Sequence, residues 1–155
     1  MQITQNFTLT EMVKSQAAIN ARIGNMPDKE QLANIILLCK HVLQPLRDAI
    51  GVVNVNSGFR SVALNQLIGG AHKIVDGQYV PTSQHCKGQA ADITCNDNSS
   101  AFNFIRQNLQ FDQLIWEFGN DNSPAWIHVS YSENFNRKQV LRAFSVNGRT
   151  VYEPA

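Results

Sequence analysis

The chain has 155 residues, of which 43% are hydrophobic and 16% charged, and its formal net charge is +1. This composition is typical of one soluble globular domain, residues 1–155, that buries a core without disulfide bonds. The near-neutral charge and the lack of a Lys/Arg run argue against partners such as nucleic acid or an anionic membrane. We therefore expect a monomer that recognises its substrate in a pocket.

No apolar run approaches the about 20 residues that a membrane-spanning helix needs, so membrane insertion is not expected. The first residues have neither the basic nor the apolar region of a secretory signal. The three cysteines, Cys39, Cys86 and Cys95, have no CxxC spacing, which favours a reducing compartment over a disulfide framework. We expect synthesis in the cytoplasm and, for a target outside it, release by another factor.

Helices are predicted in the first third of the chain. Thr8–Glu11 indicates a capping box, flanked by a hydrophobic staple, and predicts a helix from Leu9 to Ile19. A second helix is predicted from Asp28, with apolar residues at helical spacing up to Gly51. Pro45 lacks the amide hydrogen that the carbonyl of the residue four positions earlier would accept, so this helix should kink or break there.

After residue 51 the period changes to that of strands, with one short helix at 61–68 closed by two glycines. A helix is predicted at 99–107 with Ser99 near its N-cap, and a loop at 71–82. Asn147-Gly148 predicts a type I′ hairpin over 139–152. The other predicted strands are 52–55, 90–94, 114–118 and 126–130. Helices precede strands, so we predict an α+β fold with N-terminal helices packed on a small antiparallel sheet.

Three residues form a candidate zinc site. His85 and Asp92 flank a segment with small residues, and His128 lies in an alternating strand that puts Trp126 and His128 on one face. Imidazole nitrogen and carboxylate oxygen both suit zinc, and three protein ligands leave a position open, as in catalytic sites. Taken alone, His85 and Asp92 could belong to a surface loop, and His128 could be a core histidine. Together the three residues favour a metal-assisted hydrolase.

Two further residues are candidates for catalysis. Glu117 lies in an apolar run, where burying a carboxylate is costly, and alternation puts it with Ile115 on one face and Trp116 with Phe118 on the other. A role as general base would explain it, although an edge-strand Glu facing solvent is the alternative. Arg60, after a strand, could clamp a substrate carboxylate or make a surface ion pair.

His72 is a possible substrate contact without defined spacing, and Cys86 is interpreted as a bystander because adjacent residues in an extended segment face opposite ways.

The motifs resemble the M15 family of zinc peptidases, which cut peptidoglycan stem peptides. The resemblance spans roughly residues 7–131 and rests on Ser57-Gly58-Phe59-Arg60-Ser61, Leu64-Asn65, Gly69-Gly70-Ala71, the SxHxxGxAxD segment from Ser83 to Asp92, and Trp126-Ile127-His128. It implies a hedgehog/DD-peptidase-like fold, a zinc cofactor held by the candidate ligands, and Arg60 in contact with the substrate. Ser83 and Trp126 are expected to bind substrate as well.

The position of the base departs from this pattern. Many relatives carry a Glu three residues before the second His, where this chain has Ala125. Glu117 is the nearest acidic residue on a suitable strand, and the hedgehog domain, a structural relative, also takes its glutamate from the preceding strand end.

The resemblance implies a peptidoglycan peptidase, with a phage endolysin acting on the cell wall or in the periplasm as the first interpretation. A D-Ala-D-Ala carboxypeptidase of bacterial wall remodelling is the second. Two other classes stay open: an inactive, zinc-stabilised phage structural or binding module, and an interaction domain without metal.

Overall fold

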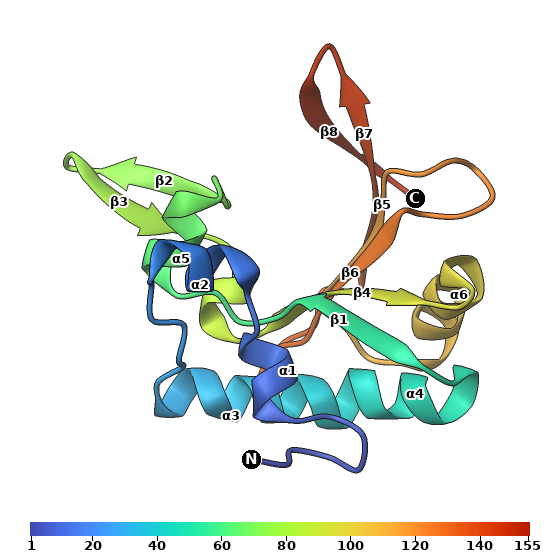
Figure 1. The fold of residues 1–155 in the computed structure, drawn as a ribbon. Coiled ribbons are helices and arrows are strands. Elements are labelled where there is room, and N and C mark those ends of the chain that lie inside the picture. Colours follow the sequence, from blue (N-terminus) through green and yellow to red (C-terminus); the bar gives the residue numbers. More distant parts are fainter.

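The computed structural model describes residues 1–155 and confirms the α+β fold, with helices covering one face of a six-stranded sheet (Figure 1). The strand order is β1-β4-β6-β5-β7-β8. The strands are β1 (Val53–Ser57), β4 (Ala90–Cys95), β5 (Gln113–Glu117), β6 (Trp126–Ser130), β7 (Gln139–Val146) and β8 (Arg149–Pro154).

The sheet is mixed, whereas the sequence predicted an antiparallel one. β5 lies between β6 and β7, and it pairs parallel with β7 while every other neighbouring pair is antiparallel. The cause is the segment 131–138, which carries the chain past β5 instead of folding β7 back onto β6. The neighbouring strands β1, β4, β6 and β5 pair antiparallel, as predicted.

The first predicted helix is two helices, α1 (Leu9–Val13) and α2 (Gln16–Ala21). The capping box is confirmed: the Thr8 hydroxyl accepts the Glu11 N–H, and the Glu11 carboxylate accepts the Thr8 N–H at 2.8 Å. The prediction of one continuous helix was wrong because Lys14 is extended and Ser15 caps a new helix by accepting the Ala18 N–H.

The second predicted helix changes geometry next to Pro45, as expected. It consists of α3 (Lys29–Leu38), a π-helical turn η1 (Cys39–Leu43) and α4 (Gln44–Ile50). The Gln44 N–H bonds to the Cys39 carbonyl, five residues back. The missing N–H of proline is a physical reason for such a turn.

Three short helical elements follow: α5 (Val62–Leu67), a 3₁₀ turn η2 (Gln84–Lys87) and α6 (Asn98–Asn108). Asp97 caps α6 by accepting the Ser100 N–H, so the N-cap lies two residues before Ser99, near which it was predicted.

The segment predicted as a loop, 71–82, is a hairpin of β2 (His72–Val75) and β3 (Gln78–Pro81). Its turn is Asp76-Gly77, and both residues have positive φ, 50° and 77°. Such Asp-Gly turns favour hairpins, but the exposed four-residue strands lack the alternation that would reveal them. The second hairpin, β7–β8, turns at Asn147-Gly148 as predicted, with φ of 50° and 75°.

The core lies between the sheet and the α3–α4 and α6 helices. Its residues include Ile35, Leu38, Val42, Leu43, Leu46, Ile93, Phe102, Ile105, Leu114, Ile127 and Val129. The residues that alternate with these on β4, β5 and β6 therefore face the opposite side of the sheet. That side carries the polar site described below. None of the helices is long and apolar enough to cross a bilayer.

Candidate metal centre

The three candidate ligands converge although two of them lie on different strands and one lies in a turn. Asp92 on β4 pairs directly with His128 on β6, and Ser57 on β1 pairs with Asp92. A register shift between Val55 and Ser57 brings Ser57 opposite Asp92. Because side chains directly opposite share a face, Ser57, Asp92 and His128 form one row across three strands.

His85 is brought to this row by the η2 turn. Ser83 caps the turn, accepting the His85 N–H at 3.3 Å, and Gly88 ends it with a φ of 72°. A Cβ on Gly88 would lie 2.4 Å from the Gln31 carbonyl oxygen of α3, so a glycine is required there. The turn is thereby seated on α3, and the buried His85 side chain faces Asp92.

Two of the three ligand candidates, His85 and Asp92, have a further partner that orients them. Nδ1 of His85 lies 2.8 Å from the Gly58 carbonyl oxygen, which makes Nδ1 the donor and leaves a lone pair on Nε2. Oδ2 of Asp92 accepts a hydrogen bond from Nη2 of Arg60 at 3.0 Å. Arg60 is itself held by the Ser57 hydroxyl, which accepts from its Nε at 3.0 Å.

The electrostatics keep Asp92 ionised. Burial by itself would raise the pKa of Asp92, but its interactions with His128 and His85 outweigh this effect and hold the pKa well below its usual range. For His85, burial is the largest effect and lowers the pKa, which favours the neutral imidazole. A carboxylate beside neutral imidazole is the protonation state that metal ligation needs.

The donor set fits a zinc ion. Oδ1 of Asp92 lies 3.4 Å from Nε2 of His85 and 3.0 Å from Nδ1 of His128, and one ligand atom from each residue lies within 4.8 Å of the others. Ligand atoms about 2.0–2.2 Å from a tetrahedral zinc ion lie roughly 3.3–3.6 Å from one another. The two distances from Oδ1 of Asp92 to the histidine nitrogens are close to that spacing. Nε2 of His128, the ring nitrogen not used in these spacings, is buried without a hydrogen-bond partner, so the protein alone leaves one polar contact of this ring unmade.

Glu117 lies beside this row, at the end of β5. It pairs with Trp126, while Ile115 pairs with His128, so Glu117 is the diagonal neighbour of His128 on the same face. The side chain is buried, with 8% of the residue exposed. Burial raises the pKa of Glu117 to about 7; the electrostatic effect of His128 opposes this rise and that of Asp92 adds to it. A carboxyl group poised near neutrality suits a general base.

The side chains of β5 lie on the predicted faces of the sheet, except for Phe118 at the end of the strand. Trp116 packs edge-on against Phe102 of α6, on the core side, as expected. Phe118, predicted to share that side, has a φ of 53° and contacts Trp126 with ring centroids 5.3 Å apart. The positive φ ends the strand and turns this ring into the cleft.

All seven residues singled out from the sequence line one cleft of about 810 Å³: Arg60, Ser83, His85, Asp92, Glu117, Trp126 and His128. Their catalytic and binding roles stay predictions. Asp121, the acidic residue in the segment between β5 and β6, forms a 2.7 Å ion pair with Arg142, and its side chain is exposed. His72 is exposed and stacks on Tyr79, and Cys86 is buried beside the site.

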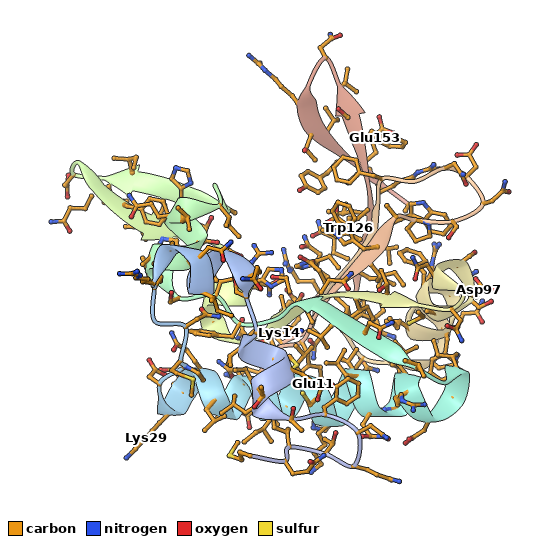
Figure 2. All side chains as sticks on the ribbon, in the orientation of Figure 1. Glu11, Lys14, Lys29, Asp97, Trp126 and Glu153 are labelled. Atoms are coloured by element: carbon orange, nitrogen blue, oxygen red, sulfur yellow. The ribbon has the colours of Figure 1, made fainter.

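Two hairpins border the cleft. Gly69, Gly70, Ala71 and Thr82, which flank the β2–β3 hairpin, line one side; Gln139, Leu141 and Tyr152 of the β7–β8 hairpin line the other. Figure 1 shows these hairpins projecting on either side of the central strands, and Figure 2 labels Trp126 where β6 begins. The sequence reasoning missed the β7–β8 residues, because alternation defines two faces of a strand without saying which one meets the site.

The sequence reasoning also missed a buried support, Asp112. Its carboxylate accepts hydrogen bonds from Gln84 Nε2 at 2.8 Å and from Arg137 Nη2 at 2.7 Å, and from the Arg137 Nε and backbone N–H at 3.0 Å each. Gln84 is the residue before His85, so Asp112 connects the η2 turn to the segment that leads into β7.

A metal-binding triad with a buried carboxylate beside it, at the bottom of a cleft, is the arrangement of a metal-dependent hydrolase. A family model described as Peptidase M15 matches residues 5–130. The chain therefore belongs to the M15 peptidase family, whose members are zinc peptidases. No curated protein matches the chain. The residues matched include the triad, Arg60 and Glu117, and they exclude the β7–β8 hairpin.

Proposed function

We propose that this M15 peptidase is zinc-dependent and cleaves peptidoglycan stem peptides as a phage endolysin, acting on the cell wall or in the periplasm after release from the cytoplasm. The observation that carries the zinc peptidase is the convergence of His85, Asp92 and His128 beside the buried Glu117. The substrate class is supported by the resemblance of the motifs around these residues to wall-cutting M15 enzymes.

When bound by the triad, zinc would supply a Lewis acid and lower the pKa of a coordinated water towards about 7. The residues of the chain perform the remaining tasks. Glu117 accepts a proton from the attacking water and delivers it to the leaving amine. Arg60 holds the Asp92 carboxylate in place through the 3.0 Å contact with Oδ2.

Arg60 is tied to the candidate metal ligand Asp92. Its Nε donates to Ser57 and its Nη2 to Asp92. A guanidinium carries five N–H donors, so these contacts leave others for a substrate group. We propose cleavage within the stem peptide or its cross-link, with removal of a terminal D-Ala as the alternative.

Digestion of purified peptidoglycan tests this proposal. Zinc-loaded protein should release soluble fragments that mass spectrometry identifies as products of internal peptide cleavage, and Glu117→Gln should abolish their release. Free D-Ala as the sole product would support the carboxypeptidase alternative. A protein that binds zinc and yields no product from any peptidoglycan chemotype would instead be the inactive structural or binding module.

A further inference from the structure

We propose that the hydroxyl group of Tyr152 donates a hydrogen bond to the backbone of the bound peptide, which makes the β7–β8 hairpin part of the substrate-binding site. This inference rests on the proposed peptidase function of the cleft. Tyr152 lies outside residues 5–130, so the match to the M15 family does not assign it a role.

The strand register brings Tyr152 to the side of the cleft that holds Glu117. Tyr152 pairs with Ala143 of β7, and Ala143 pairs with Glu117 of β5. The three residues therefore form one row on the same face of the sheet. Ala143 is fully buried and has only a methyl side chain, so the larger phenol can lean across it towards Glu117. Tyr152 and Glu117 line the same cleft.

The charges around Tyr152 agree with this placement. Burial raises the pKa of the Tyr152 hydroxyl, and the negative charges of Glu117 and Asp92 raise it further. The hydroxyl group is therefore a protonated donor at neutral pH. No hydrogen bond contributes to the shift, and 52% of the residue is exposed, so the donor is accessible to a ligand.

Several other polar side chains on this side of the cleft have partners within the protein. Gln113 donates to Gln139 at 2.8 Å, and Arg137 and Gln84 both donate to Asp112. An extended peptide presents backbone carbonyl groups that need donors once they lose water. Tyr152 is the hydroxyl group placed to supply one next to Glu117.

A binding experiment separates this role from catalysis. The background is zinc-loaded Glu117→Gln protein, and the probe is a cross-linked stem-peptide dimer. Tryptophan fluorescence reports binding because Trp126 lines the cleft. Adding Tyr152→Phe keeps the ring and removes the donor, so the Kd should rise about five-fold, the usual effect of one neutral hydrogen bond. Tyr152→Ala should raise it further.

Val151→Ala is the matched control. Val151 precedes Tyr152 on β8, faces the opposite side, and pairs with Phe144. Its Kd should stay within two-fold of the parent. In protein with Glu117 intact, Tyr152→Phe should raise KM about five-fold with little change in kcat, and its urea midpoint should not move.

Equal Kd values for Tyr152→Phe and the control would overturn the proposal, as would a loss confined to Tyr152→Ala. If the parent protein with Tyr152 intact does not bind the dimer, the proposed substrate class is refuted and the Tyr152 contact falls with it. The first two results leave the peptidase function standing, so the two failures are distinguishable.

Discussion

Replacing Asp112 by Asn should weaken the fold by an amount that depends on pH. Asp112 is 4% exposed, and Arg137 and Gln84 bond to its carboxylate. Hydrogen bonds from Arg137 are the largest cause of a pKa lowered to about 2, and burial partly opposes them. Against an unfolded value near 3.9, the shift corresponds to about 2 kcal/mol of stability, less what solvent screening at the half-exposed Arg137 removes.

The sign follows from proton binding. Above about pH 4 the carboxyl group is ionised in both states, so the stabilisation is fully present. As the pH falls from about 4 towards 2, the unfolded chain takes up a proton that the folded protein excludes, and the stabilisation is lost. The difference in unfolding free energy between wild type and Asp112→Asn should therefore be about 1–2 kcal/mol at pH 7 and approach zero near pH 2.

Urea titrations followed by tryptophan fluorescence at several pH values measure this difference. Asp121→Asn is the control, because its exposed ion pair with Arg142 should contribute less than about 1 kcal/mol. A difference for Asp112→Asn that stays constant between pH 7 and 2.5, or that never exceeds the control, would refute the reasoning.

Three further predictions concern the site. His128→Ala should lose the bound zinc that elemental analysis detects, and the stabilisation by added zinc, whereas His72→Ala should keep both; equal zinc in the two variants contradicts the site. Glu117→Gln should lower peptidoglycan hydrolysis by about 10²–10⁴-fold at unchanged zinc content, so full activity would reassign the base. Gly88→Ala should destabilise the protein, because φ is 72° and the new Cβ would press on the Gln31 carbonyl; an unchanged melting temperature would refute this.

The convergence of the candidate ligands His85, Asp92 and His128 could be predicted from the sequence because their signal is local. His85 and Asp92 belong to one short motif, and alternation in β6 faces His128 away from the apolar residues beside it. Local sequence also pointed to Glu117, because burying a carboxylate in an apolar strand is costly unless the group has a chemical role. Element boundaries were less predictable where one side chain decides them: Ser15 starts a new helix at the point where the helical pattern continued.

What the sequence could not supply is the pairing of strands that are distant in the chain. Tyr152 meets the site only because β7 crosses to the far side of β5 and pairs in the register Glu117–Ala143. Shifting β8 by one residue would turn Tyr152 away from the cleft and bring a neighbour of different chemistry to its place. The register that joins β5, β7 and β8 therefore decides which side chains can contact a peptide beside Glu117. The β7–β8 hairpin lies outside residues 5–130, the part of the chain matched by the family model. With the contact proposed for Tyr152, substitutions in this hairpin should change substrate preference while the triad and Glu117 stay the same.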